Sequence, residues 1–148
     1  MNHIITYNSI LSMCRELSSF EGRRLIDSQG ESIYPEVLIT AQDEPFITRF
    51  IKEGASAIHS AIRYALADVS ADANKVSFSP VVGNGLERAS DATKLLTETL
   101  AMYVMQRWLA DKADDRAKAY ALIYDNMLAS LTRVAHRKYA PTLSDYDD

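Results

Sequence analysis

Long stretches of this chain carry apolar residues at alternating steps of three and four, which is the spacing of one face of an α-helix. Residues 43–68, 87–109 and 114–138 have this pattern, and a shorter version of it covers residues 9–20. Each such helix must bury its apolar face against another element. The fold predicted from this pattern is mainly α, a helical bundle of three long helices plus a short N-terminal helix.

The boundaries of two of these helices are suggested by single residues. Gly22 follows the first stretch and is expected to end it, because glycine readily adopts the conformation of a helix C-terminus. The helix that begins near residue 43 is expected to run to residue 67 or 68. Gly54 lies inside it and predicts a close crossing with another helix, since glycine carries no side chain that would hold the backbones apart.

Residues 75–82 break the helical pattern between the second and third predicted helices. Val76 and Phe78 alternate with serines, which is the period of a β-strand, and Pro80 suits an edge or a bend. One strand cannot form a sheet alone, and residues 32–39 are the candidate partner within the chain. We expect this extended segment to complete itself against a neighbouring chain. The subunit contact predicted there consists of Val76, Phe78, Pro80 and Val82.

The helix predicted over residues 87–109 is apolar on more than one side. Such a helix is either central in a bundle or buried at a subunit contact. Met102, Met105 and Trp108 belong to this wide apolar surface. We expect these three side chains to be covered by another chain.

The chain offers few side chains for catalysis or metal binding. It has one cysteine and three histidines, and the histidines lie far apart in the sequence. Cys14 falls on the apolar stripe of residues 9–20, where a role in the core is expected. The sequence has no phosphate-binding loop and no metal-ligand spacing. We therefore expect no catalytic site, no metal and no cofactor, and predict that the protein is not an enzyme.

A basic cluster closes the last predicted helix and consists of Arg133, Arg137 and Lys138. Cations are favoured at this position, because the C-terminal end of a helix is the negative end of its dipole. The net charge of −4 argues against a general coating of nucleic acid. We interpret the cluster as a patch that faces a protein partner, or DNA that passes without sequence readout. The alternative is a small helical enzyme or nuclease that uses His136 together with Arg133 and Arg137.

The length of 148 residues fits a single domain. Within it we expect an N-terminal helix and linker at residues 1–35, the core of the bundle at residues 36–141 and an acidic tail at residues 142–148. No signal peptide is recognisable, and no apolar run is long enough to span a membrane. A free thiol without a signal predicts a reducing cytoplasm, or a particle assembled there.

Over residues 36–141 the chain resembles the head–tail connector, or adaptor, proteins of tailed bacteriophages. The resemblance is carried by the helix at 43–58, the extended segment at 76–82 and the helices at 95–108 and 119–131, followed by a basic stretch and Pro141. It implies a small, mostly helical subunit of a ring beneath the portal, at the capsid vertex. In that family a loop or hairpin between the helices joins neighbouring subunits, and the terminal helices meet the portal or the next neck ring. Residues 1–35 go beyond the compact family pattern.

The resemblance implies a structural virion protein located in the neck of the particle and assembled in the host cytoplasm. Its partners would be other copies of itself in a dodecameric ring, the portal protein, tail or neck proteins, and DNA in the lumen. No membrane and no cofactor are implied. The residues alone leave a second hypothesis open, a cytoplasmic helical interaction or regulatory module that acts as a dimer. The oligomeric state separates the two hypotheses.

Overall fold

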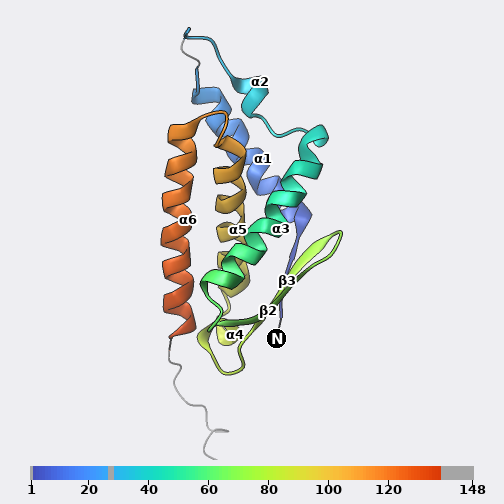
Figure 1. Cartoon of the computed structure of the whole chain (residues 1–148), viewed down its shortest axis with the longest axis vertical. Helices are drawn as coiled ribbons and strands as arrows, with labels where there is room; N and C mark the ends of the chain where they lie inside the picture. The colour runs from blue at the N-terminus through green and yellow to red at the C-terminus, as the bar shows by residue number, and fades with distance from the viewer. Residues whose placement is uncertain (1, 27–28, 138–148) are drawn as a thin grey trace, which may run out of the picture.

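The computed structural model describes residues 2–26 and 29–137 of the chain. Within these residues the protein is mainly helical, with a small three-stranded antiparallel sheet (Figure 1). Its elements follow in the order β1 (His3–Thr6), α1 (Tyr7–Arg24), α2 (Tyr34–Val37), the 3₁₀ helix η1 (Ala41–Asp43), α3 (Glu44–Ala61), β2 (Leu66–Ala71), β3 (Lys75–Pro80), α4 (Gly85–Arg88), α5 (Ala92–Leu109) and α6 (Asp114–Ala135).

The first helix is longer than the sequence predicts. α1 has 18 residues, as many as α3 and α5, so the bundle has four long helices where three and a short one were expected. Thr6 caps the N-terminus of α1, because its side-chain oxygen accepts a hydrogen bond from the Ser9 amide at 3.3 Å. Gly22 does not end the helix. A Cβ atom there would lie 2.8 Å from Tyr34, so this glycine lets α2 pack closely against α1.

α5 is the central helix of the bundle, and α1, α3 and α6 each pack against a different side of it (Figure 1). Its buried residues therefore lie on several sides, which accounts for the wide apolar surface seen in the sequence. On the α1 side, Cys14 is fully buried beside Ala101, and burial raises the pKa of its thiol to about 12. On the α3 side, a Cβ atom at Gly54 would lie 2.8 Å from Tyr103, so the predicted close crossing is confirmed.

The second predicted helix ends earlier than its periodicity suggested. α3 stops at Ala61, residues 62–65 form a turn, and Leu66 and Val69 belong to strand β2. The apolar residues of this stretch suit either element, and pairing with β3 decides between them. The turn between β2 and β3 is fixed by Asp72, whose Oδ1 accepts hydrogen bonds from the amides of Asn74 and Lys75 at 2.7 and 2.8 Å. These bonds lower the pKa of the Asp72 carboxyl.

The predicted extended segment is the central strand of the sheet. β3 pairs antiparallel with β1 on one side and with β2 on the other, so both of its edges are satisfied within the chain. The prediction that residues 32–39 pair with it is wrong, because that stretch holds α2 and the start of the connection to η1. The partners come instead from the beginning of the chain and from the end of the stretch predicted as the second helix.

The core includes the N-terminal part of the chain. Ile5 of β1 and Ile10 of α1 are buried together with residues of α3, α5 and α6. The expected division at residue 35, with the core confined to residues 36–141, therefore does not describe this bundle. The reason is geometric, since β1 completes the sheet and α1 covers one side of α5.

His3 ties the first strand to the rest of the fold. Its side chain is 3% exposed; Nε2 donates to the carbonyl oxygen of Leu86 and Nδ1 is hydrogen-bonded to Oγ1 of Thr93, both at 2.7 Å. A carbonyl oxygen only accepts, so Nε2 carries a proton. A buried histidine with both nitrogens satisfied holds β1 against the α4–α5 region.

A second polar link joins α1 to α6. Glu21 is 2% exposed, and its carboxylate accepts hydrogen bonds from Nε and Nη2 of Arg116 at 2.9 and 2.8 Å and from the Tyr120 hydroxyl at 3.1 Å. The bond to Glu21 raises the pKa of Arg116, while burial and then Glu21 raise the pKa of Tyr120 to about 12. Three donors compensate the buried carboxylate, so the link is stable although it is ionic.

The contact between α4 and α6 depends on a glycine. A Cβ atom at Gly85 would lie 1.7 Å from the carbonyl oxygen of Val134, which is backbone and cannot turn away. We expect Gly85→Ala to lower the free energy of unfolding by about 3 kcal/mol, measured by chemical denaturation. Gly54→Ala is the comparison, because its Cβ would meet only side-chain atoms and should cost less. Equal losses in the two variants would contradict this account.

The link between Glu21 and Arg116 should contribute more than an ion pair on the surface. Arg116→Ala leaves the buried Glu21 carboxylate without its main partner, and we expect a loss of about 2 kcal/mol in the free energy of unfolding, reduced by the partial exposure of Arg116. Arg15→Ala removes a half-exposed pair with Glu44 and should cost below about 1 kcal/mol. The same denaturation measurement tests both, and a larger loss in the Arg15 variant would refute the assignment.

Candidate functional site

Most of the side chains predicted to form a subunit contact lie inside the chain's own core. Phe78 is 0% exposed, and the other buried members are Val76, Pro80, Met102, Met105 and Trp108. The prediction is wrong for these six residues. β1 and β2 flank β3 within the chain, and α1, α3 and α6 cover the apolar side chains of α5. Val82 is the exception, with 88% of its surface exposed in the connection between β3 and α4.

The outer edge of the sheet also disfavours strand addition. The β2–β3 register shifts between Leu66 and Asp68, and the Asp68 carboxylate accepts a hydrogen bond from the Val69 amide at 2.9 Å. An irregularity and a charged side chain on an edge strand both discourage another chain from pairing with it. The expected completion of the extended segment by a neighbour's strand is therefore not supported at β2.

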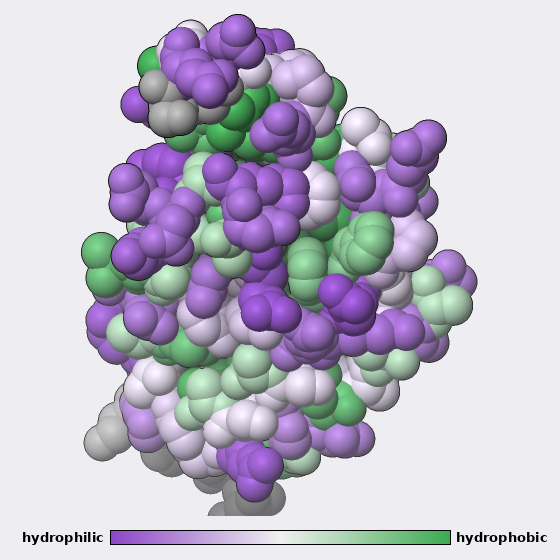
Figure 2. Space-filling view, turned by 45° about the horizontal axis from the view of Figure 1, so that its top comes forward, coloured by the Kyte–Doolittle hydropathy of each residue, from purple (hydrophilic) through white to green (hydrophobic). Residues whose placement is uncertain are grey.

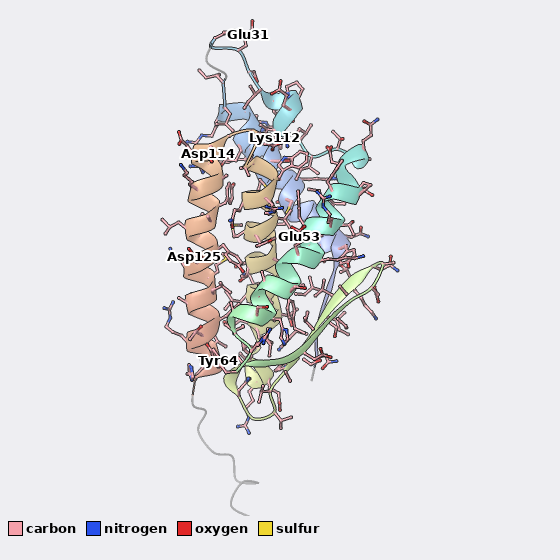
Figure 3. All side chains as sticks on the ribbon, in the orientation of Figure 1. Glu31, Glu53, Tyr64, Lys112, Asp114 and Asp125 are labelled. Carbon is pink, nitrogen blue, oxygen red and sulfur yellow. The ribbon has the colours of Figure 1, made fainter. Side chains whose placement is uncertain are left out.

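A groove of about 710 Å³ lies at one end of the described part of the chain. It lies where the segment from α2 to η1, the first half of α3 and the end of α5 meet, beside the Lys112 labelled in Figure 3. Its volume falls in the range that ligand-binding sites occupy. Its lining includes three aromatic rings, Phe46, Phe50 and Trp108, three cations, Arg49, Arg107 and Lys112, and three acidic residues, Glu36, Asp43 and Asp111.

The cations of the groove lie over the faces of its aromatic rings. The Arg49 guanidinium carbon is 5.7 Å from the centre of the Phe46 ring and 5.4 Å from that of Phe50. Nζ of Lys112 is 3.8 Å from the centre of the Trp108 ring. At these distances a cation and a ring attract each other, so both are held in position.

Two of the three cations already have acidic partners. Arg107 lies 3.4 Å from Glu53, and Lys112 lies 3.1 Å from Asp111. Arg49 forms no ion pair with any residue of the described ranges. The groove thus combines exposed aromatic surface, such as Phe46 at 51%, with a guanidinium group that is free to bind an anion. The lining carries as many acidic side chains as cations, so it has no excess of positive charge that would select an acidic ligand.

The predicted basic patch lies at the opposite end of the bundle from the groove. Arg133 and Arg137 are exposed there at the end of α6, while Lys138 lies outside the described residues. His136 stacks on Tyr64, with ring centres 5.3 Å apart and an interplanar angle of 14°, and the Tyr64 hydroxyl donates to Oγ1 of Thr132 at 2.9 Å. The structure therefore brings the three predicted side chains, Arg133, His136 and Arg137, to one end and adds an aromatic residue from another segment.

The groove residues were not identified from the sequence. They come from three separate segments, and only the fold brings those segments together. Arg49 and Phe46 also look like ordinary surface and core positions of an amphipathic helix. No periodicity or spacing in the chain distinguishes them.

The surface and the comparisons add little to these two sites. The face in Figure 2 is mostly hydrophilic, with hydrophobic residues in small separate areas. Among the described residues, no three His, Cys, Asp or Glu side chains are grouped so that they could hold a metal ion. None of the helices within residues 2–26 and 29–137 is long and apolar enough to cross a membrane. Comparison with protein-family models, curated proteins and solved structures finds no match for the chain.

Phe78 and Val82 were both predicted to contact a neighbouring subunit, but Phe78 is buried in the core and Val82 is exposed. Phe78→Asp places a carboxylate in the core, so we expect the free energy of unfolding to fall by at least about 4 kcal/mol. Val82→Asp changes an exposed side chain and should leave stability within about 0.5 kcal/mol. Thermal unfolding followed by circular dichroism measures both, and a Phe78→Asp protein as stable as the natural chain would contradict the burial of this ring.

Proposed function

We propose that the protein is a structural, non-enzymatic part of a tailed-bacteriophage particle, a head–tail connector that assembles as a ring between portal and tail. The proposal rests on the resemblance of residues 36–141 to that family and on the arrangement of the elements. A β-hairpin, β2–β3, stands between helix α3 and the helices α5 and α6. Connectors use a loop or hairpin at this place to join neighbouring subunits.

The observation that carries the proposal is the exposure of apolar side chains on two different flanks. α6 forms one flank of the molecule, and α3 with the β-hairpin forms the other (Figure 1). Leu122 on α6 is 62% exposed, and Ile123 beside it is exposed as well. On the other flank, Phe46 of α3 and Ile4 of β1 are exposed.

Two different apolar flanks suit a head-to-tail contact between copies. Such a contact is heterologous, meaning that each copy uses one surface toward one neighbour and another surface toward the next. Repeated contacts of this kind close into a ring when the rotation between neighbours allows it. A dimer with two-fold symmetry would instead use one surface twice and leave the other flank exposed.

The ends of the bundle would then face the neighbouring parts of the neck. We infer that one end contacts the portal protein and the other contacts tail or neck proteins. In this proposal the basic end, with Arg133 and Arg137, faces a protein partner or DNA that passes through the lumen without sequence readout. The location that follows is the neck of the virion, with assembly in the host cytoplasm.

Electron microscopy and native mass measurements of the purified protein test this proposal. We expect rings or ring segments in the presence of the portal protein. Leu122→Asp combined with Ile123→Asp should abolish them while leaving the helical content unchanged, because both side chains are exposed. Lys94→Glu, which changes an exposed cation of α5, is the control and should still assemble.

Two outcomes would overturn the proposal. A stable dimer that does not grow with concentration or with the portal protein would favour the alternative, a helical interaction or regulatory module. Rings that form equally well in the Leu122→Asp, Ile123→Asp protein would show that this flank of α6 is not the contact.

A further inference from the structure

We propose that the basic end of the bundle binds the backbone phosphates of duplex DNA through four arginines, Arg63, Arg88, Arg133 and Arg137. The inference rests on the proposed function, in which DNA passes through the ring, and it commits to one of the two partners that this end could face. It also adds Arg63 and Arg88, which lie outside α6 and were not part of the basic cluster seen in the sequence.

Three segments that are far apart in the sequence meet at this end of the molecule. The ring of Tyr64, labelled near the end of α6 in Figure 3, stacks on His136 with ring centres 5.3 Å apart. Nδ2 of Asn84, the residue before α4, donates to the carbonyl oxygen of Ala65 at 2.6 Å. α4 in turn packs against the end of α6 through Gly85. The turn after α3, the short helix α4 and the last residues of α6 therefore form one continuous surface.

These contacts bring together arginines that the sequence keeps apart. Arg63 and Arg137 are each next in the chain to one ring of the aromatic stack, so the stack holds their backbones at the same end. Arg88 is the last residue of α4, and Arg133 lies in the last turn of α6. All four side chains are exposed, so a ligand can reach each of them.

No carboxylate within residues 2–26 and 29–137 forms an ion pair with any of the four arginines. Arg133 donates from Nη2 to Oγ of Ser130 at 2.8 Å, which orients the guanidinium without neutralising it. Each guanidinium group therefore keeps its charge and most of its donors for a ligand. A phosphate accepts two parallel hydrogen bonds from such a group, which makes arginine well suited to bind it.

The acidic residues of the same region are fewer than its arginines. Glu87 of α4 is partly buried, and its Oε2 accepts a hydrogen bond from the Gly83 amide at 3.2 Å. Asp91 follows α4, and Asp68 follows the turn after α3, where its Oδ1 accepts a hydrogen bond from the Val69 amide. Even with these three carboxylates counted, the end has an excess of positive charge, although the whole chain carries −4. A local excess of this kind attracts a polyanion to an otherwise acidic protein.

The spread of the arginines favours a duplex over an acidic peptide. They come from three segments and project from an exposed surface. A peptide usually depends on a few side chains that are buried in pockets. Duplex DNA instead presents one negative charge for about every 1.7 Å of its axis, so dispersed cations can each meet a phosphate. Such contacts carry no sequence information, as the passage of DNA through a lumen requires.

Fluorescence anisotropy of a labelled duplex of mixed sequence, titrated with the full-length protein at several salt concentrations, tests the proposal. We expect the affinity to fall steeply with salt, because each phosphate contact releases counterions. Four contacts predict a slope of about −3 to −4 in a plot of log K against log salt concentration. The full chain retains Asp145, Asp147 and Asp148, so the measured affinity includes any competition from its acidic tail.

A double variant and a matched control separate the site from the net charge. Arg63→Gln with Arg137→Gln removes arginines of two segments, and we expect it to weaken binding about tenfold and to reduce the slope by about 2. Arg23→Gln with Lys118→Gln removes two exposed cations near the opposite end of the bundle. The control has the same net charge and should bind within about twofold of the natural chain. Circular dichroism should show both proteins folded, because all four side chains are exposed.

The contribution of α4 is tested by Arg88→Gln alone, which should reduce the slope by about 1. An unchanged slope would remove this arginine from the site and overturn the four-arginine assignment. Equal losses in the double variant and its control would overturn the inference as a whole. So would polyglutamate with a similar number of charges, if it bound as tightly as the duplex, because the surface would then suit an acidic protein equally well.

Ring formation with the portal protein is measured separately in the same variants, and we expect it to be normal. Rings of a natural protein that does not bind DNA would overturn the inference and leave the connector function standing. Arginine-dependent binding of DNA by a protein that forms no rings would support the phosphate contact and overturn the connector function.

Discussion

The packing of α5 is the constraint on which the rest of the structure depends. A helix that is apolar on several sides is stable only if every side is covered, and here α1, α3 and α6 provide the cover. Gly54 allows α3 to approach closely, and the buried thiol of Cys14 marks the contact with α1. The sheet, the groove and the basic end are all attached to helices that pack against α5, so the position of α5 determines where they lie.

The helical part of this arrangement could be predicted because its signal is local. Periodicity identified α3, α5 and α6, and Gly54 indicated the crossing, since each inference needs only residues within a few turns of one another. The sheet could not be predicted in the same way. Val76 and Phe78 showed a strand, but its partners lie at the start of the chain and just after α3, and nothing in the strand itself specifies them. Because these partner strands were not predicted, the apolar residues of β3 were assigned to a contact with a neighbouring subunit.

The basic end and the groove also differ in whether the sequence alone could identify them. The basic end was recognised from the sequence because Arg133 and Arg137 are only four residues apart, at the end of α6 and just beyond it. The groove was not, since Phe46 and Arg49 meet Lys112 only after α3 and α5 have packed. Tyr64 is an intermediate case, as it joins the basic end from the connection after α3 by stacking on His136. A charge cluster within a few residues is visible in a sequence, whereas a hollow between helices is not.

The burial of His3 has a consequence for the order in which the chain folds. Its hydrogen-bond partner Thr93 lies 90 residues away in the sequence, so β1 is not locked in its final place until the start of α5 has been synthesised. The β2–β3 hairpin needs no such delay, because its two strands are neighbours. β1 can pair with β3 as soon as β3 has been made, because β1 precedes it in the chain. The two hydrogen bonds of His3 form only after Leu86 and Thr93 have been added, so they lock in place an edge strand that is already paired.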